Sequence, residues 1–138
     1  DVNKEEALKA MVVTSNVSYY DGIGDYIKLG YVPFDVNGTA ASTTLEYAYD
    51  DWTIYKTALN MGYEEVASQY RKRALNYHHI FDKEKGWFRP RKADGTWVEW
   101  PENARLKEWY GCIEANSYQQ GWFVPHDVPG MVNLMGGK

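Results

Sequence analysis

The apolar residues between positions 45 and 81 recur at helical spacing, and this pattern constrains the fold more than any other feature of the chain. A first run alternates intervals of three and four residues, and Gly62 separates it from a second run with a similar rhythm. Such spacing places the apolar side chains on one side of a helix, and glycine favours helix ends. The pattern therefore predicts two helices joined by one or two residues, an antiparallel helical hairpin. The runs are Leu45, Ala48, Trp52, Tyr55 and Leu59, then Tyr63, Val66, Tyr70, Ala74, Tyr77 and Phe81.

Capping patterns indicate where helices begin. Asn3 followed by Glu6 has the spacing of a capping box at the start of a first helix, and Thr43 followed by Glu46 has the same spacing at the start of the long helix. An acidic residue in the first turn also suits the positive end of a helix. The remaining helices are expected over residues 25–29, 112–123 and 127–134.

Residues 86–100 change in character. The pair Asp94–Gly95 is typical of a tight hairpin turn, and the aromatic and β-branched residues after it favour a returning strand. We therefore predict an all-α fold class, made of helical hairpins with one inserted β-hairpin near 86–100. The 138 residues suit one domain, and we expect residues 1–138 to form a single, partial domain.

Composition and charge exclude several classes of function. Lys and Arg number 15 against 19 Asp and Glu, which gives a net charge of −4 and argues against a nucleic-acid partner. No apolar run approaches the length of a membrane span. A single cysteine, Cys112, excludes an internal disulfide framework. The aromatic residues are numerous (6 Trp, 12 Tyr and 4 Phe) and suit either a packed core or a sugar-binding cleft.

One group of candidate site carboxylates lies on the long predicted helix. Glu46 and Asp50 are four residues apart and project from one side of it, with Asp51 next to them. Paired carboxylates serve acid–base chemistry or bind a cation, so Asp50 and Asp51 are possible site residues. For Glu46 the alternative is a helix-capping role.

A second constellation surrounds Glu114. We expect Glu114, Ser117, Tyr118 and Gly121 to share one face of the helix over 112–123, with the amides of three neighbouring residues close by. Amides bond sugar hydroxyls, aromatic rings stack on pyranose faces, and apolar neighbours can raise the pKa of an acid. The neighbouring amides are Asn116, Gln119 and Gln120, and Trp122 adds a further ring. For His126 and Asp127 a structural histidine and a helix cap are the alternatives.

Phosphate-binding and metal-binding motifs are absent from the sequence. His78 and His79 are adjacent, so on a helix they would point about 100° apart and make a poor metal pair. No metal site is therefore predicted from these residues.

Eight short stretches, in the same order along the chain, resemble the catalytic domain of glycoside hydrolase family 92, the calcium-dependent exo-α-mannosidases. They run from about residue 25 to the end of the chain. The stretches are Gly30-Tyr-Val-Pro33, Thr44-Leu-Glu-Tyr-Ala-Tyr-Asp-Asp-Trp52, Arg73-Ala-Leu-Asn-Tyr77, Phe81-Asp82, Asp94-Gly-Thr-Trp97, Glu114-Ala-Asn116 with Gln119, Trp122-Phe-Val-Pro-His-Asp127 and Gly136-Gly137.

The resemblance implies part of an (α/α)6 toroid packed against a β-sandwich, a calcium ion in the full-length enzyme, and inverting hydrolysis of terminal α-linked mannose, as in α-1,2-mannosidases. It implies Glu114 as general acid and Asn116 and Gln119 in the sugar pocket, with Tyr118 and Trp122 as further binding residues. Ala115 replaces the family's usual glycine, and Tyr118-Gln119-Gln120 stands where Trp-Gln-Tyr is common. The implied partners are mannose-containing glycans and the remainder of the polypeptide, in the periplasm or outside the cell.

The family's β-sandwich, its calcium-binding segment and its general-base aspartates have no counterpart in this sequence. An inverting glycosidase needs two carboxyl groups, so we expect the 138 residues alone to be inactive. A non-catalytic carbohydrate-binding or scaffold module is the alternative, because it explains the aromatic residues and a lone acid without chemistry.

Overall fold

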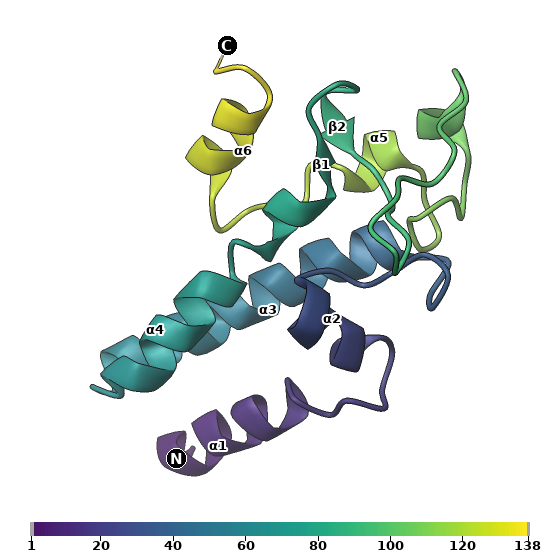
Figure 1. Ribbon diagram of the computed structural model, residues 1–138. Coiled ribbons are helices and arrows are strands. Elements are labelled where there is room, and N and C mark those ends of the chain that lie inside the picture. The colour runs from purple at the N-terminus through teal and green to yellow at the C-terminus, as the bar shows by residue number, and fades with distance from the viewer. Residues whose placement is uncertain (1, 138) are drawn as a thin grey trace.

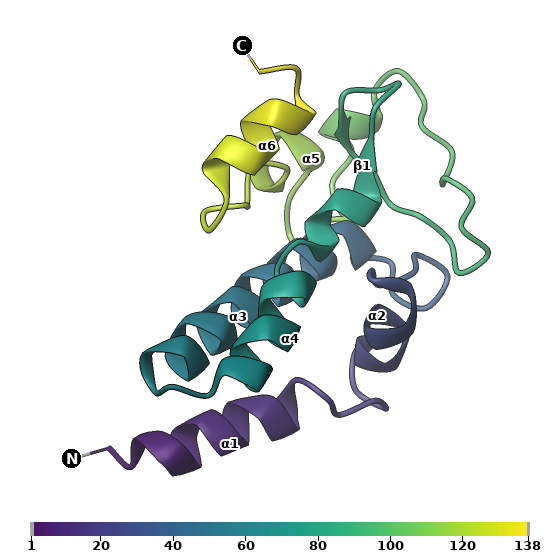
Figure 2. The same cartoon turned by 60° about the vertical axis from the view of Figure 1, so that its left-hand side comes forward.

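A long helix, α3, and its antiparallel partner, α4, form the centre of the molecule (Figure 1). The computed structural model describes residues 2–137. Figures 1 and 2 show α1 and α2 on one side of α3, and the chain from residue 76 onward on the other. The helices are α1 (Lys4–Thr14), α2 (Ile23–Leu29), α3 (Ala40–Asn60), α4 (Glu64–Arg73), η1 (Asn76–Ile80), η2 (Ala104–Leu106), α5 (Ser117–Gln120) and α6 (Val128–Leu134), and the strands are β1 (Phe81–Asp82) and β2 (Trp87–Phe88).

The α3–α4 hairpin confirms the helical hairpin predicted from apolar spacing, although three residues, 61–63, join the helices rather than one or two. The turn holds Gly62 in the left-handed region at φ +81°, which glycine adopts without a steric penalty. Apolar side chains from both helices and from α1 form one core cluster. Its buried members are Leu8, Ile54, Ala58, Ala67 and Tyr70.

The long helix begins at Ala40, so the predicted start at Thr43 is wrong. Hydroxyl groups in the first turns bond main-chain carbonyls behind them: Thr43 Oγ1 donates to Thr39 O, and Thr44 Oγ1 donates to Ala40 O. A threonine inside a helix can bond in this way as readily as it can cap one. The capping box predicted from Thr43 and Glu46 is therefore also wrong.

The second helix of the hairpin ends at Arg73, earlier than its apolar rhythm predicts. The carbonyl of Ala74, which a longer α-helix would bond internally, instead lies 2.8 Å from Nε2 of His126. The chain continues as the 3₁₀ helix η1 and then enters β1. Tyr77 and Phe81 consequently leave the α4 stripe and join a second core cluster against the first half of α3.

One small antiparallel hairpin is present, as predicted, but it lies earlier than expected. Its strands pair Phe81 with Phe88 and Asp82 with Trp87, whereas the Asp94–Gly95 turn closes only an isolated bridge between Arg91 and Trp97. Main-chain bonds from Lys92 N–H to Thr96 O and from Val98 N–H to Pro90 O flank this bridge. The guanidinium groups of Arg89 and Arg91 add bonds to the carbonyls of Val98 and Gly95. Residues 96–100 thus take part in a bridge but form no regular strand.

Of the two C-terminal helices, one is shorter than predicted and the other, Val128–Leu134 after its cap Asp127, is confirmed. The helix expected over 112–123 spans only Ser117–Gln120. Asp127 caps α6 through a 3.0 Å bond from Gly130 N–H to its Oδ1, as predicted. Asn3 likewise accepts a bond from Glu6 N–H at the start of α1. The chain is thus mostly helical with one small hairpin, which is the predicted class. No helix among residues 2–137 is both long and apolar enough to span a lipid bilayer.

Candidate functional site

The candidate acid, Glu114, lies on a turn before α5 and is exposed. Its backbone is in the left-handed region at φ +50°, a conformation that costs about 1–2 kcal/mol for a residue with a Cβ atom. The prediction that Glu114 shares a helix face with Ser117, Tyr118 and Gly121 is wrong, because this backbone conformation cannot continue a helix. The acid is instead presented by a fixed turn.

Bonds from α3 and α5 hold this turn. Ser42 N–H donates to the carbonyl of Gly111, and the N–H of Ile113 donates to Ser42 Oγ, both at 3.0 Å. The carbonyl of Ile113 accepts a 3.0 Å bond from Gln120 Nε2. The peptide groups on either side of Ile113 are therefore tied to both helices directly before Glu114.

Asn116 and Gln119 form a reciprocal capping box at the start of α5. Asn116 Oδ1 accepts from the N–H of Tyr118 (3.0 Å) and of Gln119 (3.2 Å), while Gln119 Oε1 accepts from Asn116 N–H (3.0 Å). Both side-chain oxygens are thus occupied, and within the described residues neither amide nitrogen makes a hydrogen bond. The side-chain NH2 groups of Asn116 and Gln119 can therefore donate hydrogen bonds to a ligand, and such donors suit sugar hydroxyl oxygens.

Trp122 and Tyr118 present their rings to solvent. Trp122 is 51% exposed and Tyr118 is 47% exposed. Trp122 Nε1 donates to the carbonyl of Tyr118 at 2.9 Å, and both rings pack edge-on against the buried ring of Trp87. Two large rings are therefore fixed in place and leave area for a partner such as the apolar face of a sugar ring.

A hollow of about 330 Å³ is lined by two of the predicted site residues, Gln119 and Trp122. Glu114 and Asn116 do not line it, and Tyr118 lines a separate hollow beside Arg105. The hollow at Gln119 and Trp122 is open to solvent and contains one carboxylate, that of Glu46. Partial desolvation of this carboxylate raises the pKa of Glu46, and the negative charges of Asp50 and Asp21 raise it further. The lining residues are Ser42, Glu46, Gln119, Gln120, Trp122 and Phe123.

Ser42 and Glu46 contribute to this region although the sequence analysis did not place them there. The apolar stripe begins at Leu45, so it gives no sign that the helix starts earlier and passes beneath the hollow. The signal available was the hydroxyl-rich stretch 42–44, which can bond main-chain groups inside or outside a helix.

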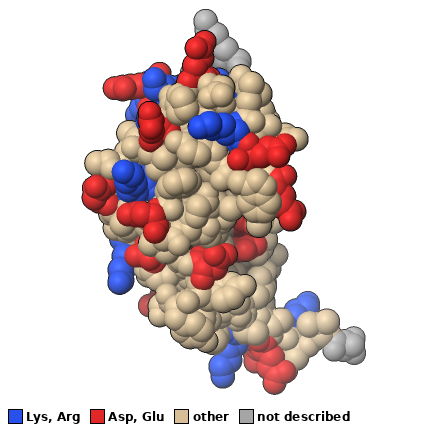
Figure 3. All heavy atoms as spheres, turned by 90° about the vertical axis from the view of Figure 1, so that its right-hand side faces the viewer, with Lys and Arg blue, Asp and Glu red and all other residues tan. Residues whose placement is uncertain are grey.

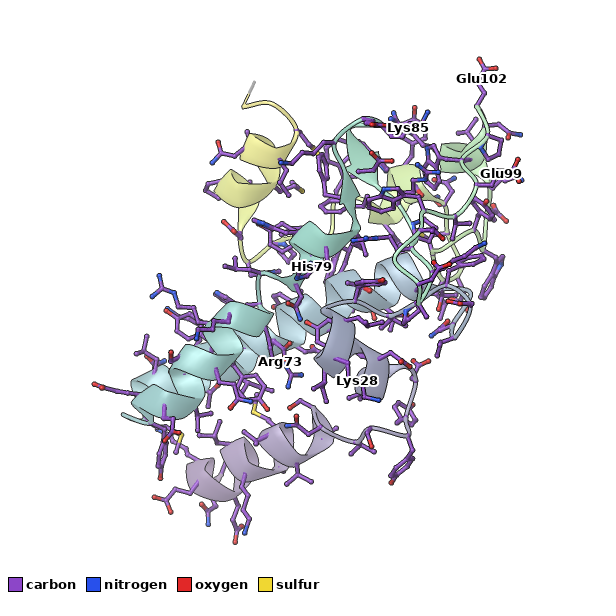
Figure 4. The ribbon with its side chains drawn as sticks, viewed as in Figure 1. Lys28, Arg73, His79, Lys85, Glu99 and Glu102 are labelled. Carbon is purple, nitrogen blue, oxygen red and sulfur yellow. The ribbon has the colours of Figure 1, made fainter. Side chains whose placement is uncertain are left out.

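Asp51 lies apart from this hollow and is buried at 1% exposure. Its carboxylate is bonded by Arg73 through two 3.0 Å contacts and by the hydroxyl of Tyr26 at 2.8 Å. Burial raises the pKa of Asp51 to about 6, although Arg73 and Tyr26 oppose the rise. Figure 4 shows Arg73 extending from the end of α4 toward α2. This arrangement joins α2, α3 and α4 and accounts for Asp51 as a structural residue.

A larger hollow of about 450 Å³ lies between α1, α2 and α3 and is mainly apolar. The exposed carboxylate Asp50 lines it together with Asp51. The structure therefore does not bring Asp50 and Asp51 together with Asn116, Gln119, Tyr118 or Trp122.

His126 and Asp127 make structural contacts. The imidazole of His126 is bonded to the carbonyl of Ala74, and burial lowers its pKa. Asp127 caps α6 and also accepts a 2.7 Å bond from the Tyr77 hydroxyl. The structural interpretation of both residues is thereby supported.

The described residues gather no group of side chains that could hold a metal ion. Figure 3 shows acidic and basic side chains interspersed on the face that it presents. Among residues 2–137 no three His, Cys, Asp or Glu side chains converge, whereas calcium in proteins takes six to eight oxygen ligands, with carboxylates prominent. The described residues therefore do not by themselves form a carboxylate cage for calcium.

Comparison with known proteins gives consistent results. The family model described as the glycosyl hydrolase family 92 catalytic domain matches residues 1–138. Two solved structures from Bacteroides thetaiotaomicron are similar over nearly the whole chain. A family GH92 α-mannosidase is 36% identical with a TM-score of 0.92, and the match covers 99% of this chain and 18% of that one. A family GH92 inverting mannosidase is 34% identical with a TM-score of 0.92, and the match covers 98% of this chain and 19% of that one. The first of these enzymes is also known in complex with mannoimidazole, with a TM-score of 0.94. A curated relative from Arthroderma benhamiae, described as an uncharacterized secreted glycosidase, is 27% identical over 85% of this chain and 19% of its own length. The chain thus spans about a fifth of the length of these relatives.

Proposed function

Because the chain belongs to glycosyl hydrolase family 92, we propose that it forms part of the active site of an inverting α-mannosidase, with Glu114 as the general acid. The observation that carries the proposal is the placement of Glu114: an exposed carboxyl on a turn bonded to two helices, close in the chain to amide donors and exposed rings. The substrate class is terminal α-linked mannose on glycans, including α-1,2 linkages.

In this proposal Glu114 donates its proton to the glycosidic oxygen as the bond from that oxygen to the anomeric carbon breaks. The free amide nitrogens of Asn116 and Gln119 bond sugar hydroxyls, and Trp122 and Tyr118 contact the sugar or the leaving group. A second carboxylate activates the attacking water on the opposite face, as inversion requires. The family resemblance assigns that base to another part of the polypeptide.

We further propose that the helical hairpins of this chain contribute to an (α/α)6 toroid as a partial domain. A calcium ion in the complete enzyme would polarise the bound sugar, and its ligands would come from outside the described residues. We also propose that the enzyme acts in the periplasm or outside the cell, which the description of the Arthroderma benhamiae relative as secreted supports.

The test compares, in the full-length enzyme, how strongly a Glu114 substitution slows the hydrolysis of substrates with poor and with good leaving groups. Glu114→Gln removes the transferable proton and should lower kcat on an α-1,2-mannobiose by about 10²–10⁴-fold, because general acid catalysis contributes about that much. A 2,4-dinitrophenyl α-mannoside, whose leaving group needs no proton, should be hydrolysed at close to the normal rate.

Glu108→Gln is the matched control, since Glu108 is an exposed acid on the same loop. It should leave both activities unchanged. Equal loss on both substrates after Glu114→Gln, or no loss on either, would remove Glu114 from this role. Sugar binding without any hydrolysis by the unsubstituted protein would favour a carbohydrate-binding module instead.

A further inference from the structure

We propose that Ser42 is a positioning residue that fixes the place of the Glu114 carboxyl relative to the bound sugar. This inference rests on the proposed role of Glu114 as general acid. Ser42 lies 72 positions before Glu114 in the chain, and its N–H and its Oγ both bond main-chain atoms of the acid-bearing turn.

Ser42 is bonded so that its hydroxyl has a fixed direction. The Oγ hydrogen is donated to Thr39 O at 3.0 Å, and therefore Oγ turns a lone pair toward the N–H of Ile113. The main-chain N–H of Ser42 belongs to the first turn of α3, where N–H groups have no partner inside the helix, and it bonds Gly111 O instead. One buried residue thus supplies both a donor and an acceptor to the turn.

These bonds act on the residue that directly precedes the acid. Ile113 is held at its N–H by Ser42 and at its carbonyl by Gln120. On the far side of Glu114, the carbonyl of Ala115 accepts a 3.1 Å bond from Trp109 N–H. The left-handed backbone of Glu114 is consequently held from both sides, as an unfavourable conformation requires.

The first half of α3 provides the rigid support to which the turn before Glu114 is bonded. Residues 40–45 are all buried, and Ala41, Leu45 and Ala48 belong to the core cluster that includes Tyr77 and Phe88. Ser42 is itself only 2% exposed and its hydrogen is already donated. It therefore acts through Glu114 rather than on the substrate.

Removing the Ser42 hydroxyl should make the position of the Glu114 carboxyl less well defined while the carboxyl itself remains. In the full-length enzyme, Ser42→Ala keeps the main-chain bond to Gly111 and deletes only the acceptor for Ile113 N–H. Because a misplacement of about 1 Å can cost about 100-fold in rate, we expect kcat on α-1,2-mannobiose to fall about 10- to 100-fold with little change in KM. Hydrolysis of 2,4-dinitrophenyl α-mannoside should be almost unchanged.

Thr43→Ala is the matched control, because it deletes the next buried hydroxyl of α3, which bonds Thr39 and not the turn. It should reproduce any general loss of stability without the leaving-group dependence. Ser42→Thr, which restores a hydroxyl, should recover much of the rate. If Ser42→Ala does not fold, Gln120→Met removes the bond on the other side of Ile113 and should give the same selective loss.

A double substitution separates this inference from the proposed function. If Ser42 acts through the acid, adding Ser42→Ala to Glu114→Gln should cause no further loss on the mannobiose. If the loss of rate in the double variant equals the product of the losses in the two single variants, the positioning role is overturned while Glu114 remains the acid. An equal loss of rate on both substrates from Ser42→Ala alone would overturn it in the same way. If Glu114→Gln itself has no effect, the proposed function fails, whatever Ser42→Ala does.

Discussion

The two sides of α3 are stabilised in different ways. On the side of α1 and α2, helices pack through apolar side chains and through the buried pair of Asp51 and Arg73. On the other side, much of the chain between residues 89 and 123 is irregular, and side chains such as Ser42, Arg89 and Gln120 bond its main-chain groups. A second apolar cluster also packs against the first half of α3 on this side, and large rings are exposed on both sides, among them Tyr19 and Trp122. In the proposed enzyme the first region would maintain the fold and the second would carry the site, and substitutions can test that division.

Asp51→Ala should have the largest effect on stability. It leaves the Arg73 guanidinium, whose side chain is only 14% exposed, without its carboxylate, and breaking such a buried pair costs about 3–5 kcal/mol. We expect a large fall in melting temperature, measured by calorimetry on the full-length enzyme. Asp50→Ala, at the exposed neighbouring position, should change stability by less than about 0.5 kcal/mol. Equal effects from the two substitutions would contradict the structural role of Asp51.

Trp122→Ala tests the exposed rings of the other region. The substitution removes a ring that packs on Trp87 but is half open to solvent. A ring–sugar contact comparable to an aromatic pair contributes about 0.5–1.5 kcal/mol, so the Kd for mannoimidazole should rise up to about tenfold. Titration calorimetry measures this change. Unaltered affinity would show that Trp122 does not contact the sugar.

Asn116→Asp distinguishes the capping role of Asn116 from sugar binding. Aspartate caps helices about as well as asparagine, so the box with Gln119 should persist and the melting temperature should hold. The free amide donor is lost, and the Kd for mannoimidazole should rise several-fold, since a neutral hydrogen bond contributes about 1 kcal/mol. Retained affinity together with lowered stability would assign Asn116 to capping alone.

The stability that the small β-hairpin gains from the ion pair of Asp82 and Arg89 should depend on pH. Burial alone would raise the pKa of Asp82, but hydrogen bonds from Arg89 and from the N–H groups of Lys85 and Glu84 lower it overall. A lowered pKa in the folded state means that the ionised carboxylate stabilises the fold above its ordinary pKa, and that this contribution is lost as pH falls through the folded-state pKa.

The measurement is the difference in melting temperature between the unsubstituted protein and Asp82→Asn from pH 6 down to pH 3. This difference should be constant near neutral pH and shrink below about pH 4, where unperturbed aspartate protonates. A difference that does not vary with pH would argue against an ionised Asp82 in the ion pair.

Several features that depend on nearby residues could be predicted from the sequence, although the capping box of Thr43 and Glu46 was predicted wrongly. The α3–α4 hairpin follows from apolar spacing, and the caps at Asn3 and Asp127 follow from bonds within three residues. The early end of α4 was not predicted, and the carbonyl left free beyond it, that of Ala74, is bonded by His126, 52 residues farther along the chain.

The same distinction holds for the candidate site. The residues Glu114, Asn116, Gln119, Tyr118 and Trp122 were identified from their types and their family resemblance, and their roles stay predictions. The conformation of the turn at Glu114 was beyond sequence reasoning, since the bond from Ile113 to Ser42 joins residues 71 positions apart. Spacing within a segment says nothing about such long-range bonds.

The attachment of Ile113 to Ser42 is made to a main-chain group, and this has a consequence for divergence. Such a bond sets no requirement on the side chain at position 113, which is partly exposed. In the proposed enzyme, loop side chains could therefore change, and substrate preference with them, while the turn that bears Glu114 keeps its attachment to α3. Adaptation to new glycans would then need no alteration of the buried first turns of α3.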